Sequence, residues 1–105
     1  MFVDDLSEYI QKVRHLTSPL TPQIIESYNF RKVWDLPEGR AYYCLPVQAD
    51  GINFVFHGDK LERGYIGRFK SVEISTRIEN ELLVLYFTMT AGKELPKIEP
   101  ANFGD

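Results

Sequence analysis

Residues 72–90 read VEISTRIENELLVLYFTMT and decide the predicted fold. In the first half, alternate positions are occupied by Val72, Ile74, Thr76 and Ile78, a pattern that predicts a strand with one dry and one wet face. A turn is expected at 79–81. The second half, 82–90, is apolar at nearly every position, which is typical of a strand covered on both faces. We therefore predict a long β-hairpin over residues 72–90.

Two helices are predicted before the sheet. Asp4 or Asp5 can cap the first, because a short acidic side chain accepts hydrogen bonds from the free N–H groups of the first turn. Its apolar residues fall at helical spacing as far as Leu16 and form one stripe. Thr21-Pro22 gives the second start signal, an N-cap hydroxyl followed by proline at the first helical position. Residues 30–36 fit either a helix or a strand.

From residue 40 the apolar pattern changes to a period of two. Strands are expected over 40–47 and 52–57, joined by a turn at 48–51 that contains Asp-Gly. Pro46 lacks a backbone N–H, so the first of these strands is placed at a sheet edge or ends there. Residues 37–39 are predicted to form a turn and 58–64 a loop. A bulge or bend is expected near 67–71.

Helices followed by strands indicate the α+β class. We predict two N-terminal helices on one face of a mainly antiparallel meander sheet of four or five strands. A single domain is expected over 1–105, with a helical layer at 1–36, the sheet at 40–90 and an irregular tail at 91–105. Several strands are apolar on both sides, so the second sheet face is expected either to curl on itself or to contact another chain.

The composition limits the classes of function. The chain has 105 residues and a net charge of −3, so long-range attraction to nucleic acid is not expected. One cysteine excludes an internal disulfide and is typical of the reducing cytosol. The N-terminus does not have the pattern of a secretory signal, and no apolar run is long enough for a membrane helix. We therefore expect a soluble cytoplasmic protein that needs no cofactor.

Chemical sites are weakly indicated. His15 and His57 suggest a pair of acid–base groups, although nothing in the sequence brings them together. His57, Asp50 and Asp59 would form a minimal metal site only if two strand ends met, and turn formation explains the aspartates equally well. Cys44 is interpreted as a small buried apolar residue. We predict neither catalysis nor a metal.

The segment 63–70 interleaves cations, aromatic residues and glycines. This composition can bind phosphates and stack on bases. The alternative is a bulged strand with one basic, solvated face, which the overall acidity favours. The nucleic-acid alternative, including a small RNase-type phosphodiesterase, would use Arg63, Tyr65, Arg68, Phe69 and Lys70.

Three hypotheses remain for the function. The leading one is a small acidic protein-binding module, most concretely an inhibitor or immunity protein that occludes the basic site of a toxin, a nuclease or another enzyme. The alternatives are the nucleic-acid protein just described and a structural subunit that pairs with its own copy. The leading hypothesis places the partner-binding surface at Asp35, Glu38, Tyr42, Asp50, Asp59 and Glu62.

Overall fold

The computed structural model describes residues 3–67 and 72–98. Its helices are α1 (Val3–Val13), α2 (Pro22–Ser27) and α3 (Glu79–Met89), with a short 3-10 helix η1 (Pro37–Gly39). Its strands are β1 (Arg31–Leu36), β2 (Arg40–Val47), β3 (Asp50–His57), β4 (Lys60–Ile66) and β5 (Val72–Ile74). The five strands form one sheet in sequence order, and each neighbouring pair is antiparallel. The predicted α+β class and meander are confirmed.

The predicted hairpin over residues 72–90 is wrong in its second half. Only 72–74 are strand, and Glu79–Met89 form a helix. Burial follows the helical period: Glu79, Leu82, Leu83 and Phe87 are buried. The remaining apolar residues are half-buried because they face other parts of the same core. A helix that is apolar nearly all round has no clear amphipathic period, so its sequence resembles that of a buried strand.

The ends of α3 carry helix signals. Arg77 and Ile78 donate their backbone N–H groups to Glu81 Oε1, at 2.9 and 3.2 Å. The side chain at the third helical position thus supplies half of a capping box. At the other end Gly92, with a φ of +107°, donates its N–H to the Phe87 carbonyl at 2.9 Å. Glycine after the last turn is a common helix ending, because it tolerates positive φ.

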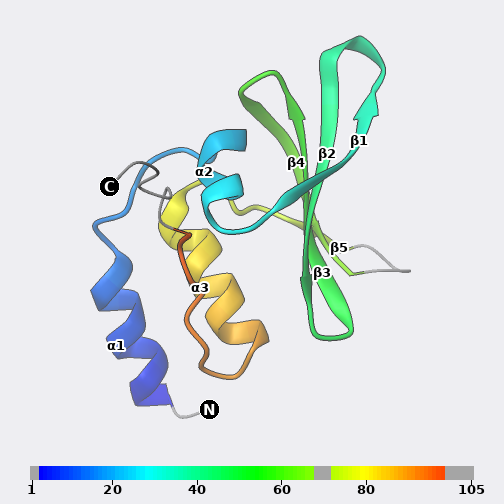
Figure 1. Ribbon diagram of the computed structural model, residues 1–105. Helices are drawn as coiled ribbons and strands as arrows, with labels where there is room; N and C mark the ends of the chain where they lie inside the picture. The colour runs from blue at the N-terminus through cyan, green and yellow to red at the C-terminus, as the bar shows by residue number, and fades with distance from the viewer. Residues whose placement is uncertain (1–2, 68–71, 99–105) are drawn as a thin grey trace, which may run out of the picture.

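The helices lie on one side of the sheet, with α3 between α1 and the strands (Figure 1). Tyr9 of α1 stacks on Phe87 of α3, with ring centroids 4.2 Å apart. The expected layer of N-terminal helices therefore also contains a helix from the C-terminal half. The sheet side of the core is built from alternate residues of the central strands: Tyr43, Leu45, Val47, Ile52, Phe54 and Phe56.

Residues 31–36, which fit either a helix or a strand by sequence, form β1. The helical layer therefore does not extend to residue 36, and the sheet occupies residues 31–74 instead of the predicted 40–90.

The turn at 37–39 is confirmed as η1, with Glu38 and Gly39 at positive φ. The β2–β3 turn is Gln48–Ala49, and Asp50 and Gly51 belong to β3. The β3–β4 connection is only Gly58–Asp59, because residues 60–64 belong to β4.

The β2 strand is central, contrary to the edge position inferred from Pro46. However, β1 pairs with β2 only as far as Cys44, so the segment around Pro46 has β3 as its one partner. A proline can therefore be accommodated without the loss of a ladder hydrogen bond. Most of the predicted bulge at 67–71 lies outside the described residues. In the described part of the chain, no helix combines the length and apolarity that a membrane span requires.

Candidate functional site

The uncovered face of the sheet is the side that carries no helix (Figure 1). The strand register assigns residues to it, since side chains alternate between the two sides of a strand. The pairs Tyr42–Val55 and Cys44–Asn53 lie on this face, whereas Tyr43 pairs with Phe54 on the helix side. Cys44 is half-buried on this face and does not belong to the buried core, which corrects the reading of it as a fully buried residue.

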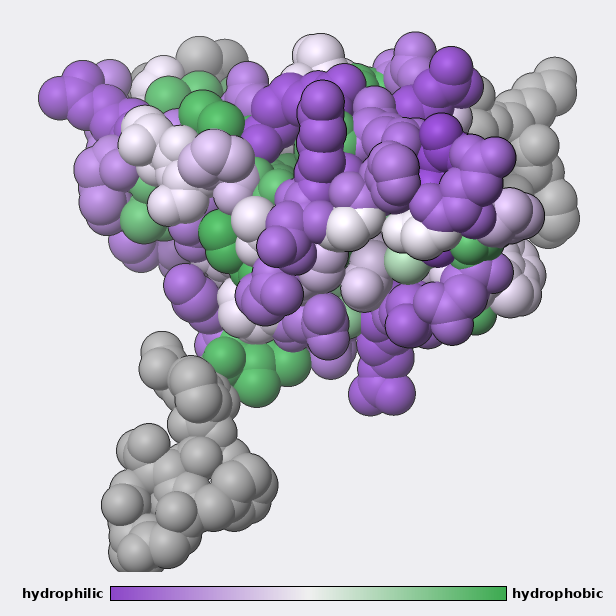
Figure 2. Space-filling view, turned by 90° about the horizontal axis from the view of Figure 1, so that it is seen from above, coloured by the Kyte–Doolittle hydropathy of each residue, from purple (hydrophilic) through white to green (hydrophobic). Residues whose placement is uncertain are grey.

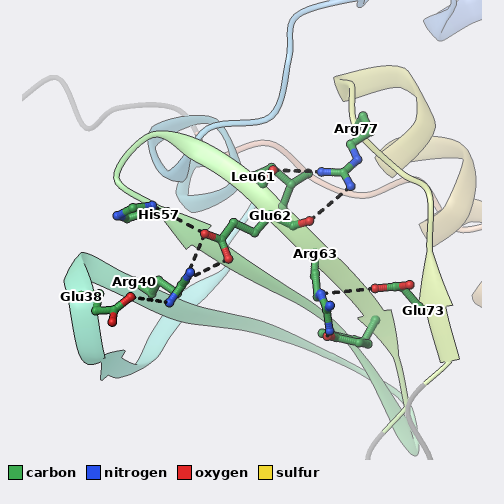
Figure 3. A network of polar contacts seen from close by, with 9 residues as sticks. Glu38, Arg40, His57, Leu61, Glu62, Arg63, Glu73 and Arg77 are labelled. Atoms are coloured by element: carbon green, nitrogen blue, oxygen red, sulfur yellow. Dashed lines mark hydrogen bonds and ion pairs between the residues drawn. The ribbon is translucent and has the colours of Figure 1, made fainter.

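A polar network occupies the end of the uncovered face near the η1 and β3–β4 turns (Figure 3). At its centre is Glu62, the extra residue of a bulge in β4: Val55 pairs with Arg63 and Phe56 with Leu61. Bulges redirect a side chain relative to a regular strand. Here the single N–H of Arg40 Nε is shared between the two oxygens of the Glu62 carboxylate, each 3.0 Å from Nε.

Other charged groups extend this network. Arg40 also donates to Glu38 at 3.2 Å, and His57 Nδ1 lies 3.6 Å from Glu62. The hydrogen bond and the charge of Glu62 raise the pKa of the Arg40 guanidinium. Arg77 donates to the backbone carbonyl groups of Leu61 and Glu62. The acids of the network are thus paired within the molecule. Figure 2 views the molecule from above, where Figure 1 places these turns, and shows a largely hydrophilic surface.

The rest of the uncovered face, from Tyr42 to the β2–β3 turn, has a different character. Trp34 is 62% exposed and Val33 is 45% exposed. The Trp34 ring lies 5.4 Å from the Tyr42 ring, centroid to centroid, with an angle of 41° between their planes. These residues border a hollow of about 380 Å³, called here the aromatic hollow, which is lined by Val33, Trp34, Tyr42, Cys44, Pro46, Asp50, Gly51, Asn53 and Gly67.

The floor of the aromatic hollow contains a buried amide. Asn53 is 3% exposed and donates its Nδ2 to the Gly67 carbonyl at 3.2 Å. The amide oxygen is therefore on the other side of the group, toward Gly51: a Cβ at position 51 would lie 3.7 Å from Asn53 Oδ1 and 3.5 Å from Cys44 Sγ. A Cβ at position 51 would thus be in van der Waals contact with the amide oxygen, and glycine makes no such side-chain contact.

The predicted partner-binding residues lie in different parts of the sheet. Glu38, Asp59 and Glu62 belong to the end with the η1 and β3–β4 turns, where Gly58 N–H donates to the Gly39 carbonyl. Asp35 pairs with Ala41, so its side chain lies on the helix side of the sheet, away from the uncovered face. Asp35 forms an ion pair with Lys32 at 3.0 Å, which raises the pKa of the lysine. Asp50 lines the aromatic hollow, and Tyr42 stands in its wall.

Of the residues predicted for nucleic-acid binding, the structure describes Arg63 and Tyr65. Arg63 Nη1 donates to the Tyr65 hydroxyl at 3.3 Å, and Arg63 Nε lies 3.7 Å from Glu73. This arginine therefore already has an anionic partner. The predicted Arg68, Phe69 and Lys70 lie outside the described residues.

The structure does not bring together the residues of the two-histidine hypothesis or of the metal-site hypothesis. His15 follows α1, whereas His57 ends β3, and no contact between described residues joins them. Asp50 and His57 stand at opposite ends of β3, so they cannot share a metal as the hypothesis required. Among the residues with described positions, no three His, Cys, Asp or Glu side chains are grouped to hold a metal ion.

Three residues of the hollow were missed by the sequence prediction. Trp34 lies in residues 30–36, whose pattern fits either a helix or a strand. As the single tryptophan of the chain, it belongs to the residue types enriched at the centre of protein interfaces. The sequence pattern places Gly51 in a turn and Asn53 within a strand, and neither position carries a signal for a binding hollow. Comparison with protein-family models, curated proteins and solved structures finds no match to the chain.

Proposed function

We propose that the protein is a small cytoplasmic protein-binding module, an inhibitor or immunity protein that covers the basic site of a toxin, a nuclease or another enzyme. The observation that carries the proposal is the exposed Trp34, 62% accessible beside a hollow on the uncovered face of the sheet. Exposed aromatic residues next to a hollow are typical of the residues that dominate protein interfaces. The net charge of −3 favours a basic partner.

The acidic residues and the aromatic hollow have different roles in this proposal. Glu38 and Glu62 are paired with Arg40 in the free protein, and Asp35 is paired with Lys32. Their charges therefore contribute mainly to steering the encounter, which raises the association rate. The aromatic hollow supplies the apolar contact that slows dissociation.

The experiment uses two variants with equally exposed apolar side chains. Trp34→Ala removes the side chain beside the hollow, whereas Val72→Ala changes a 64% exposed residue of β5. The purified protein and both variants are immobilised and incubated with lysate of the native host. We expect the wild type and Val72→Ala to retain one protein that Trp34→Ala releases, as identified by mass spectrometry.

The retained protein is then purified and mixed with the module. The proposal requires a one-to-one complex that weakens as salt rises, and saturating loss of the partner's enzymatic activity. A partner that binds while keeping full activity contradicts the inhibitor role. A gel shift with RNA or DNA at low salt would favour the nucleic-acid alternative, and a dimer mass in light scattering would favour the self-pairing subunit.

A further inference from the structure

We infer that the aromatic hollow receives the side chain of an arginine from the partner protein. The inference rests on the proposed function, and it adds the chemistry by which the partner is recognised. It is drawn from the ring geometry, the charge and the hydrogen-bonding groups of the hollow.

The aromatic wall suits a flat cation. Trp34 and Tyr42 stand with their centroids 5.4 Å apart at an angle of 41°, and much of the tryptophan is exposed. A guanidinium group is planar and weakly hydrated, so it stacks on an aromatic face more readily than an ammonium group does. Its three methylene groups can lie along the apolar side chains of the wall.

The charge of the hollow has one sign. Among the described residues that line it, Asp50 is the one charged residue, and it is an acid. An incoming cation therefore meets complementary charge, whereas a carboxylate or phosphate would meet repulsion.

The floor supplies an acceptor for a donor-rich ligand. The Asn53 amide has its nitrogen committed to the Gly67 carbonyl, and its oxygen lies on the Gly51 side. An amide oxygen carries two lone pairs and accepts from N–H donors. A guanidinium has five N–H groups in a fixed fork and no acceptor, which matches this floor. The volume of about 380 Å³ is at the small end of ligand pockets and suits one side chain.

The test uses the arginine side chain alone, without any partner protein. N-acetyl-arginine amide is titrated into the protein at constant ionic strength, and the fluorescence of Trp34, the single tryptophan, is recorded. N-acetyl-citrulline amide has nearly the same shape without the charge. We expect a saturable change with a Kd on the order of 1 mM for the arginine probe. Citrulline should bind about tenfold more weakly.

Two matched variants locate the binding. Asp50→Asn and Asp59→Asn each remove one acidic charge, the first at the start of β3 beside the hollow and the second in the β3–β4 turn, away from the hollow. We expect Asp50→Asn to weaken the arginine probe about threefold and Asp59→Asn to leave it unchanged. Gly51→Ala places a methyl group about 3.7 Å from the Asn53 amide oxygen and should also weaken binding of the arginine probe.

The inference is overturned if citrulline binds as well as arginine, if both Asp variants behave alike, or if Trp34 fluorescence does not saturate. It is also overturned if adenosine monophosphate binds more tightly than arginine, because the hollow would then favour a nucleobase. These results leave the proposed function open to its own test. Conversely, a hollow that binds arginine in a protein that retains no partner would contradict the proposed function alone.

Discussion

At the scale of single residues, Gly64 of β4 lies where any side chain would collide with residues of the neighbouring strands β3 and β5. A Cβ at this position would lie 2.9 Å from Phe54 Cε1 and 3.0 Å from Ile74 Cγ1. Phe54 is completely buried and cannot move aside. Gly64→Ala should therefore lower the free energy of unfolding by about 1–3 kcal/mol, the usual cost of overpacking, as measured by urea denaturation.

The matched control is Gly51→Ala, also in a strand, where the nearest atom would lie at 3.4 Å. We expect a change within about 0.5 kcal/mol, since the contact is ordinary and alanine loses less backbone entropy than glycine. Equal effects of the two substitutions would contradict this account of Gly64.

Tyr9 gives a prediction in alkaline solution. Burial, followed by the charge of Glu94, raises the pKa of Tyr9 to about 12 from its usual value of 10.0. Below pH 10 the tyrosine is protonated in both the folded and the unfolded chain, and its contribution to stability is complete. As pH rises from 10 to 12, the unfolded chain ionises first, so this contribution is lost.

Tyr9→Phe should therefore flatten the fall in unfolding free energy between pH 10 and 12, by on the order of 1–2 kcal/mol. Burial and the hydrogen bond to Glu79 also raise the pKa of Tyr28, so part of the fall should remain. Stability curves for wild type and variant that stay parallel across this range would refute the prediction.

At the scale of elements, α3 shows where period alone misleads. The sequence 82–87 is apolar at every position, so the pattern does not distinguish a buried helix from a buried strand. The end signals do distinguish them: Glu79 and Glu81 stand in the first turn, and Gly92 follows the last. Both N-terminal helices were predicted, because they carry a clear apolar stripe or the Thr21-Pro22 start signal. The limits of the first were wrong: α1 begins at Val3, so Asp4 and Asp5 lie within the helix instead of capping it, and it ends at Val13 before reaching Leu16.

Glu81→Ala tests the start of α3. The substitution removes the acceptor for the N–H groups of Arg77 and Ile78. We expect a loss of about 1 kcal/mol in unfolding free energy, typical of a helix cap, with little change in helix content by circular dichroism. Glu8→Ala, an exposed acid within α1, serves as the control and should change stability by less than about 0.5 kcal/mol.

The residues of the uncovered face could be predicted only in part, because the periodic pattern of one strand does not show how it pairs with its neighbours. Alternation in β2 and β3 separates Tyr42 from Tyr43 without any structure. The bulge at Glu62 changes the phase within β4, and the register of β1 against β2 places Trp34 beside Tyr42. Both depend on pairing between strands, which a single strand's sequence does not specify.

At the scale of the whole molecule, the segment after α3 completes the core. Leu95 is buried at 7% exposure, whereas Ile98, three residues later, is 49% exposed. Between them Lys97 places its ammonium 3.7 Å from the buried Glu79 carboxylate and 5.5 Å from the Tyr28 ring centroid. This irregular segment is thus bound to both α2 and α3.

Leu95→Ala should therefore cost about 2–4 kcal/mol in unfolding free energy, as expected for a buried leucine. Ile98→Ala should cost less than about 0.5 kcal/mol, because about half of the residue is already exposed to water. Thermal or urea unfolding measures both. A small effect at Leu95 would indicate that the segment contributes little to the core.

The packing of α1 on α3 also affects how the chain folds during its synthesis. Each strand pairs with a strand close to it in the sequence. The apolar stripe of α1, in contrast, packs on α3, which begins only at residue 79. During synthesis on the ribosome, the meander can close while the first helix still lacks its cover. The apolar face of α1 thus stays exposed until α3 has emerged from the ribosome, and during that interval it is a binding site for chaperones.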